Sequence, residues 1–460
     1  MKPKLAASGL KSAAITALIA LLAGCTAPMA DVDAQGEGNA AQGEVITMWR
    51  PITSDAEQTY IQENFVDAYN ATNPVNPVEV SYRDWNTAAQ LQQASVAAGE
   101  GPDIIYTAGP SNALAYIQAG QLLPLNKYAE EFGWNDKIQP WALETGYSEA
   151  NLYLIPETYE TMLMLYSPET FEANGWSVAS NRSDFDTFVQ QSQDAGMTAI
   201  ATGNKSWAPT TEHLLSVVLN NVAGPEAVYE ALSGNKSWTD PEFVDAITTM
   251  KGWFDSKAMG GGSEMYFSTT VEELYNSIAT DTASTYWTGS WAFNNVGEYF
   301  PEDGQGKSWD WSLVPPLSDR VSEPPVSIGI GRTIAVNAAT KNPDGAAAYI
   351  NWLIQNPKAQ LAKTAAIGVA PMPLMFDAAD FPADIDPRVA SLYQTIADAK
   401  TIGYLTWTFW PPKSNRYLYE EMDKVIVGDL SVEDYLAGLD ALFAQELAEG
   451  LVPPRPNPSN

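Results

Sequence analysis

The alternation of apolar and polar positions predicts short strands separated by amphipathic helices. Residues 45–49 form a run typical of a β-strand, and Ser54 followed by Glu57 has the spacing of a capping box that opens a helix. Residues 78–82 and 102–106 predict two further strands, and a helix follows the third. Because strands and helices alternate, the pattern predicts a mainly parallel sheet covered by helices.

The same order recurs in the last third of the chain. Residues 334–336 predict a strand, and Asn342, which precedes a proline, opens a helix. Ser431 opens a last helix, which the proline-rich tail 453–460 cannot continue. The length favours two or more domains, yet no linker rich in Pro, Gly or Ser divides the chain after residue 43. Two lobes joined by several short crossings would account for both observations.

The first 24 residues predict a secretion signal. Three lysines precede or flank an apolar run, 13–23, that is shorter than the roughly 20 residues needed to span a bilayer. The signal ends before Cys25 in a sequence that resembles the bacterial lipobox, whose cysteine is acylated and becomes the new N-terminus. Cys25 is the one cysteine of the chain, so the sequence predicts lipid attachment and no disulfide. Residues 25–43 are small and polar and predict a flexible tether.

Charge and histidine content exclude several classes of function. The formal net charge is -32 at pH 7, which makes nucleic acid and anionic membrane surfaces poor partners. This acidity is typical of a solvated surface, although a cationic ligand or a salty or acidic habitat would also produce it. His213 is the single histidine, and neither a nucleophile elbow nor a cysteine cluster accompanies it. The sequence therefore predicts no metal site, no cofactor and no catalytic triad.

Several segments resemble one known family. Residues 101–106 and 115–125 resemble the best-marked stretch of the family 1 extracellular solute-binding proteins, whose familiar members are the maltose-type receptors. Four later segments resemble the family in the expected order: 154–171, 288–292, 328–343 and 427–433. The resemblance implies an α/β, two-lobed periplasmic-binding-protein-like fold of type II, with three interlobe crossings and the ligand between the lobes.

The resemblance also implies lobe boundaries and a function. It places the N-terminal lobe at 44–155 plus 314–354 and the C-terminal lobe at 156–313 plus 355–452. The function implied is that of a monomeric, non-enzymatic receptor that captures a sugar and delivers it to the transmembrane permease subunits of an ABC importer. The lipid anchor would hold it on the cell membrane, facing the outside or the periplasm.

A sugar site requires two kinds of side chain. Sugars present apolar C–H faces and a ring of hydroxyl groups, so aromatic planes and planar polar groups bind them well. The chain has 15 tryptophans, and several lie at strand ends or in loops. By resemblance, Trp291 occupies the position of a tryptophan that stacks on sugar in the maltose-type receptors. The aromatic candidates are Trp291, Trp410, Trp49, Trp85, Trp287 and Trp407.

Polar candidates flank the same segments. Glu157 and Glu160 lie just past the first predicted crossing, and Arg332 follows two glycines that allow close approach of the backbone. The full set of polar candidates is Arg50, Asp84, Ser111, Glu157, Glu160 and Arg332.

Two other functions stay open on the sequence. A secreted glycoside hydrolase would use the same tryptophans, with Glu157 and Glu160 as its acid and base, although these lie three residues apart on one segment. A receptor for a polyamine or another cation would also use tryptophans and carboxylates. Among sugars, the number of aromatic residues favours an oligosaccharide or a glycoside.

Overall fold

The computed structural model describes residues 43–52, 54–300 and 306–458. The predicted signal 1–24, the lipidation site Cys25 and the tether up to residue 42 lie outside these described residues. Residues Gly43–Asn460 form one compact unit. Within the part of the chain that is described, no helix is both long and apolar enough to cross a membrane.

The helices and strands follow one another as the sequence pattern predicts. The strands are β1 (Ile46–Pro51), β2 (Val78–Arg83), β3 (Ile104–Thr107), β4 (Tyr147–Ser148), β5 (Asn151–Leu152), β6 (Leu154–Tyr166), β7 (Thr198–Ala201), β8 (Ala283–Gly289), β9 (Asp310–Ser312), β10 (Val326–Val336) and β11 (Ile402–Tyr404). The α-helices are α1 (Asp55–Ile61), α2 (Ala68–Asn70), α3 (Trp85–Ala97), α4 (Leu114–Gln118), α5 (Asn126–Phe132), α6 (Pro140–Glu144), α7 (Pro168–Asn174), α8 (Arg182–Asp194), α9 (Thr210–Val218), α10 (Pro225–Leu232), α11 (Pro241–Asp255), α12 (Ser263–Tyr266), α13 (Val271–Ala279), α14 (Pro343–Ile354), α15 (Pro357–Ile367), α16 (Pro387–Ala397), α17 (Thr406–Phe409), α18 (Pro412–Val427) and α19 (Val432–Ala448).

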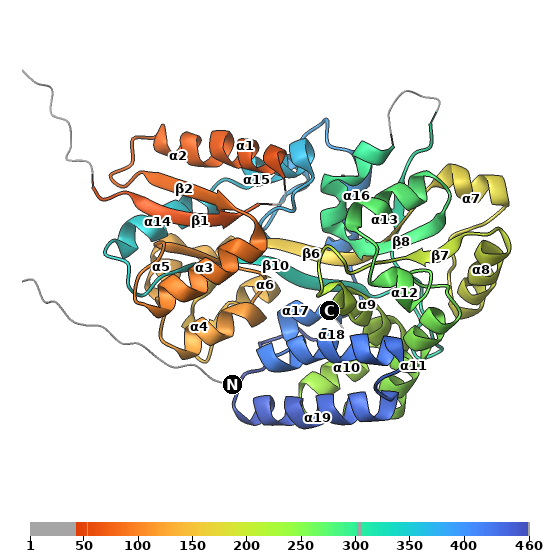
Figure 1. Cartoon of the computed structure of the whole chain (residues 1–460). Coiled ribbons are helices and arrows are strands. Elements are labelled where there is room, and N and C mark those ends of the chain that lie inside the picture. Colours follow the sequence, from red (N-terminus) through yellow and green to blue (C-terminus); the bar gives the residue numbers. More distant parts are fainter. Residues whose placement is uncertain (1–42, 53, 301–305, 459–460) are drawn as a thin grey trace, which may run out of the picture. The chain divides into compact units, whose positions relative to one another are not determined.

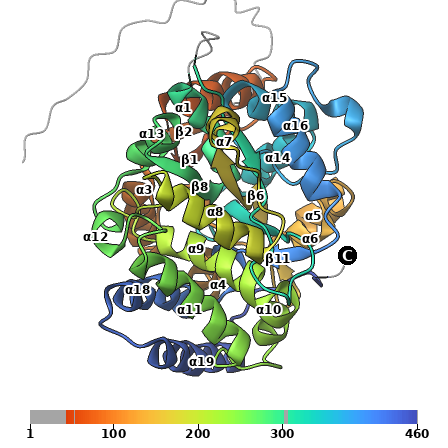
Figure 2. The same cartoon turned by 90° about the vertical axis from the view of Figure 1, so that its right-hand side faces the viewer.

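A single sheet links the two ends of this unit (Figure 1). Its main path runs β2-β1-β3-β10-β6-β8-β7, with β11 paired to β10 and β9 paired to β6. The pairs β1–β2, β1–β3, β7–β8 and β10–β11 are parallel. The pairs β10–β3, β10–β6, β6–β8 and β6–β9 are antiparallel, so the sheet is mixed and the prediction of a mainly parallel sheet was wrong. Helices α3 and α14 contact β1 and β10, while α8, α9 and α13 contact β7 and β8. Figure 2 shows α18 and α19 side by side, in agreement with their contacts.

The long strands β6 and β10 connect the two parts of the sheet. They pair with each other from Leu154 to Thr161, and the rest of β6 pairs with β8 and β9. Two irregularities interrupt their pairing, because Gly331 on β10 and Glu157 on β6 each lack a register partner. These two bulges compensate each other, so the register is the same before and after them.

Strand β6 is buried on both faces, which explains its unbroken apolar sequence. Met162 and Met164 belong to one hydrophobic cluster, together with Trp287 of β8. Leu163 and Leu165 belong to another, together with core residues of β1 and β10. Because successive side chains of a strand point to opposite faces, four consecutive apolar residues are needed to fill both clusters.

Local capping fixes the helix starts that the sequence predicts. The Ser54 hydroxyl accepts a hydrogen bond from the Glu57 amide at 3.1 Å, and Asn342 and Ser431 cap α14 and α19 in the same way. After α19 the tail lies along β11, where the Tyr404 hydroxyl donates to the Pro456 carbonyl at 2.7 Å.

Helix α15 contacts α1 and α14. The Lys363 ammonium on α15 lies 5.9 Å from the centre of the Phe65 ring. The predicted lobe boundaries assign α15 to the C-terminal lobe, but α1 and α14 to the N-terminal lobe. Those boundaries stay a prediction.

Candidate functional site

The parallel strands β1, β2 and β3 end at the same edge of the sheet, where several predicted site residues lie. Trp49 is half-buried, and the Arg83 guanidinium lies 4.8 Å from the centre of its ring. Asp84 is exposed and caps α3 by accepting a hydrogen bond from the Thr87 amide at 2.9 Å. Trp85 is the first residue of that helix. The strand ends therefore supply one aromatic ring and one positive charge near solvent.

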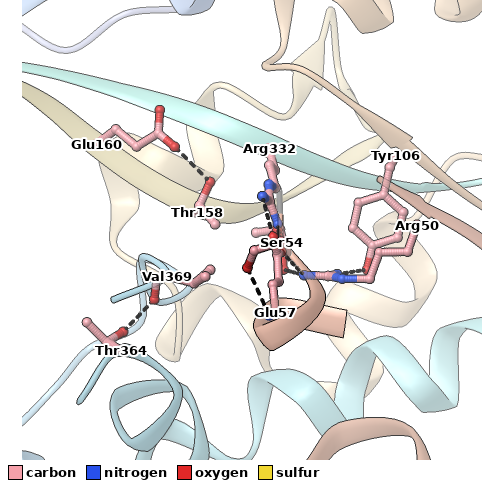
Figure 3. A network of polar contacts seen from close by, with 10 residues as sticks. Arg50, Ser54, Glu57, Tyr106, Thr158, Glu160, Arg332, Thr364 and Val369 are labelled. Carbon is pink, nitrogen blue, oxygen red and sulfur yellow. Dashed lines mark hydrogen bonds and ion pairs between the residues drawn. The ribbon is translucent and has the colours of Figure 1, made fainter. Parts of the chain in front are cut away.

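Four charged side chains next to this edge bind one another, and Figure 3 labels Arg50, Glu57 and Arg332 among them. Arg50 donates to the Tyr106 hydroxyl at 2.6 Å and to Glu157 Oε1 at 2.8 Å. Glu57 forms an ion pair with Arg332 and lies 3.7 Å from the Arg50 guanidinium. We call Arg50, Glu57, Glu157 and Arg332 the ion network. Their exposed fractions are 3%, 1%, 4% and 7%, so the charges neutralise one another inside the protein.

The ion network holds Glu157 in its charged form. Burial alone would raise the pKa of Glu157, but the positive charges of Arg50, Lys363 and Arg332 outweigh burial and lower it. The pKa of Arg332 is raised, because Glu57 and Glu157 together overcome its burial. Sequence analysis predicted Arg50, Glu157 and Arg332 as ligand contacts; in the structure Arg50 binds Glu157, and Arg332 binds Glu57. It assigned Glu57 to a helix cap alone and missed its ion pairs.

Glu160 differs from Glu157 although both lie on β6. It is half-buried and lies apart from Arg50 and Glu57 in Figure 3, and its Oε1 accepts from the Thr158 hydroxyl at 3.5 Å. Burial raises the pKa of Glu160 to about 7, although Arg332 opposes the shift. Gly331 makes room for this carboxyl group, because a Cβ atom at that position would lie 2.0 Å from Glu160 Oε1.

Three rings from distant elements form an aromatic cluster. His213 of α9 lies 4.8 Å from the ring of Trp291 and 5.2 Å from that of Trp407, and the two indoles lie 5.7 Å apart. His213 and Trp291 are half-buried, and Trp407 is 7% exposed. The Trp291 ring packs on Gly289, where a Cβ atom would lie 1.9 Å from it. Burial lowers the pKa of His213 to about 3, so the cluster is uncharged at neutral pH.

The end of β3 reaches this aromatic cluster. A Cβ atom at Gly109 would lie 2.7 Å from the Trp407 carbonyl oxygen and 2.9 Å from that of Ile330. Ser111 is 1% exposed, and its hydroxyl donates to the Trp410 carbonyl at 2.5 Å. Gly109 also has a φ of +81°. Glycine is therefore favoured there both by the close backbone contacts and by the positive φ. The end of β3 thus contacts the backbone of Trp407 and of Ile330, and Ile330 precedes the Gly331 against which Glu160 packs.

The sequence of the chain matches one protein family over most of this structure. Residues 53–360 match the sequence model of the bacterial extracellular solute-binding proteins. The chain belongs to this family. No curated protein sequence matches the chain significantly.

Solved structures of similar shape agree with a solute-binding protein. A chitin oligosaccharide binding protein has a TM-score of 0.74 at 19% identity, and the match covers 89% of this chain and 100% of that one. The GacH receptor of Streptomyces glaucescens, studied with acarbose, has a TM-score of 0.70 at 17% identity, covering 88% and 99%. The maltose/maltodextrin-binding domain MalE of Bdellovibrio bacteriovorus, bound to maltotriose, has a TM-score of 0.65 at 13% identity, covering 88% and 100%. At these identities the similarity shows the fold, which confirms the predicted two-lobed α/β architecture.

Two tryptophans predicted as ligand contacts lie inside the core of this solute-binding protein. Trp410 has no exposed surface and packs 5.3 Å from the ring of Trp238. Trp287 is 1% exposed and lies 5.6 Å from both Phe185 and Trp253. In this conformation neither indole has a face available for a ligand, because long-range packing places both in the hydrophobic cluster that contains Met162 and Met164. Nothing in the local sequence distinguishes Trp410 from Trp407.

Proposed function

We propose that this solute-binding protein captures a carbohydrate between its two lobes and delivers it to the transmembrane permease subunits of an ABC importer. The observation that carries this proposal is the aromatic cluster of His213, Trp291 and Trp407, which adjoins polar groups of the strand ends. The family of the chain supports the general role. The similar proteins named for chitin oligosaccharide, acarbose and maltotriose support the choice of a carbohydrate.

The chemistry of the aromatic cluster suits a neutral, hydroxylated ligand. The half-buried Trp291 ring offers a plane for the C–H face of a sugar, and the neutral His213 ring extends it without adding charge. Glu160, with a pKa of about 7, can accept or donate a hydrogen bond to a hydroxyl group. Trp49 and Asp84 at the strand ends would line the facing side. Ligand that contacts both lobes would favour the closed conformation.

The two alternative functions fit these contacts less well. A receptor for a polyamine needs ionised carboxylates, but burial raises the pKa of Glu160 to about 7 and that of Glu212 beside the aromatic cluster to about 8. A glycoside hydrolase that uses Glu157 and Glu160 would need both carboxyl groups to reach one sugar. Glu157 is instead 4% exposed and bound to Arg50.

Tryptophan fluorescence of the purified chain, titrated with sugars and with polyamines, tests the proposal. The sugar panel contains chito-, malto- and xylo-oligosaccharides and their monosaccharides, and spermidine and putrescine form the second panel. We expect a saturable change with at least one sugar, unaffected by moderate salt, with the sugar recovered intact. A salt-sensitive response to spermidine alone, or release of reducing sugar, would overturn the carbohydrate receptor.

We further propose that the mature protein is a monomer anchored by lipid at Cys25. Cells grown with labelled palmitate should incorporate the label into the wild-type chain and not into Cys25→Ser. A labelled Cys25→Ser chain would contradict the anchor and leave the sugar proposal intact.

A further inference from the structure

A small cavity lies inside the protein beside the ion network. Its lining includes the polar residues Arg50, Glu157, Gln360 and Lys363, together with Tyr349 and apolar residues such as Phe65. Each of the four polar residues is at most 4% exposed. The centre of a water molecule can occupy about 10 Å³ of this cavity. That volume accommodates a single water molecule.

Several residues that line this cavity have polar atoms without a hydrogen-bond partner among the described residues. Arg50 Nε, Glu157 Oε2 and Gln360 Oε1 are buried and have no hydrogen-bond partner among the described residues. The ammonium group of Lys363 interacts with Glu157 electrostatically, and burial lowers the pKa of Lys363 to about 8. Buried polar atoms in folded proteins are almost always paired, with protein groups or with ordered water.

We propose that the cavity binds one internal water molecule, which accepts hydrogen bonds from Arg50 Nε and Lys363 Nζ and donates to Glu157 Oε2 and Gln360 Oε1. A water molecule has two acceptor and two donor positions, and the lining supplies two donors and two acceptors. The water joins three segments that are distant in sequence, namely β1, β6 and α15. It thereby ties α15 to the strand that connects the two parts of the sheet.

The mixed character of the lining distinguishes water from an ion. A chloride ion would be attracted by Arg50 and Lys363 but would face the oxygens of Glu157 and Gln360. A metal cation would suit those two oxygens but would face the N–H groups of Arg50 and Lys363. Water is the small molecule that can satisfy all four at once.

A crystal structure of the purified protein at a resolution that shows ordered water tests this site, together with a second crystal soaked in bromide. We expect one well-ordered peak about 2.7–3.2 Å from the four polar atoms, without anomalous signal after the soak. An anomalous peak at this position would establish an anion site, and a cavity without density would also overturn the proposal.

Two matched variants test the role of Gln360. Gln360→Met keeps the length of the side chain but removes Oε1, so the water peak should disappear and the melting temperature should fall by a few degrees. Gln355→Met changes an exposed glutamine nearby and should alter neither. A water peak of unchanged position and occupancy in Gln360→Met would contradict the assignment of Gln360. If that variant does not fold, the wild-type crystals still decide between water, an ion and an empty cavity.

Discussion

The ion network and the aromatic cluster both contain residues that the sequence marks as ligand contacts, but their surroundings differ. In the ion network each charged group has a partner of opposite sign, and all four side chains are below 10% exposed. In the aromatic cluster, by contrast, His213 and Trp291 keep part of their rings exposed. Side chains that already satisfy one another act in stability, whereas side chains with free surface can act in binding. Whether a polar or aromatic residue at a strand end can bind a ligand thus depends more on its contacts in the folded protein than on its residue type.

The largest effect is expected from breaking the ion network. Glu57→Gln removes the negative charge that faces Arg332 and Arg50, which leaves excess positive charge in the interior. Breaking a buried ion pair in this way costs about 3–5 kcal/mol of the free energy of unfolding. Denaturant unfolding measures the loss, and the exposed Glu63→Gln is the control that should stay within about 0.5 kcal/mol of wild type. A stable Glu57→Gln variant that no longer binds ligand would place the network in the binding site instead.

The next largest effect is expected from the pH dependence of stability, which a carboxyl group beside the aromatic cluster controls. Burial raises the pKa of Glu212, beside the aromatic cluster, from 4.5 to about 8, although Asn415 and Thr406 oppose the shift. The folded protein therefore retains a proton that the unfolded chain releases above about pH 4.5. The free energy of unfolding should fall as the pH rises from about 4.5 to 8, by about 1.4 kcal/mol per pH unit at the steepest and by a few kcal/mol at most.

Glu212→Gln tests this sign, because the amide stays neutral throughout. Unfolding measured between pH 5 and 8 should give a flatter profile than wild type. The remaining slope comes from Glu160 and Asp423, whose pKa values are also raised, and it is opposed below about pH 6.5 by His213, whose pKa is lowered. The exposed Glu226→Gln serves as the control with an unchanged profile. A profile of the same steepness in Glu212→Gln would mean that Glu212 is ionised in the folded protein.

Trp291→Ala separates binding from stability. Removing the ring should weaken binding of the sugar by about 10- to 100-fold, equivalent to about 1.4–2.8 kcal/mol, because the stacking plane is lost. The control is Trp352→Ala, which removes a half-buried ring on α14 that packs against Phe65 and Tyr69. Calorimetric titration should show an unchanged dissociation constant for that control. Equal losses of affinity in both variants would indicate a general loss of folded protein.

The smallest effect is expected at Gly331. Gly331→Ala places a methyl group where the Glu160 carboxyl lies, so that carboxyl must move. We expect a loss of about 1–2 kcal/mol in the free energy of unfolding, together with weaker sugar binding. Gly297→Ala is the matched control, since no described atom lies within 4 Å of its Cβ position. Wild-type affinity in Gly331→Ala would remove Glu160 from the proposed site.

Local features of the fold could be read from the sequence because their causes are local. The caps at Ser54, Asn342 and Ser431 each involve a side chain and an amide two or three residues away. The parallel pairing of the first strands follows from the alternation of strands and helices. The family could also be predicted from the sequence, because five segments that each resemble it weakly occur in the expected order.

The site could be predicted only in part, because its contacts are not local. Arg50 and Glu157 are 107 residues apart in sequence, and no local pattern around either residue predicts that they pair. His213 was assigned no role, yet it lies between two predicted tryptophans that come from different elements. Trp407 and Trp410 are three residues apart, yet Trp407 within α17 contacts Trp291, whereas Trp410 just after the helix has no exposed surface and packs on Trp238.

The pairing of β6 with β10 is least regular at the paired bulges of Gly331 and Glu157. On either side of them the two strands form a regular, stiff ladder, while at the bulges the ladder hydrogen bonds are interrupted. Because the two irregularities cancel, the register of the two strands is the same on both sides of them. We expect the ladder to bend most readily here, where its hydrogen bonding is least regular. Glu157 lies at this point and Glu160 packs against Gly331, so such bending would displace both carboxyl groups.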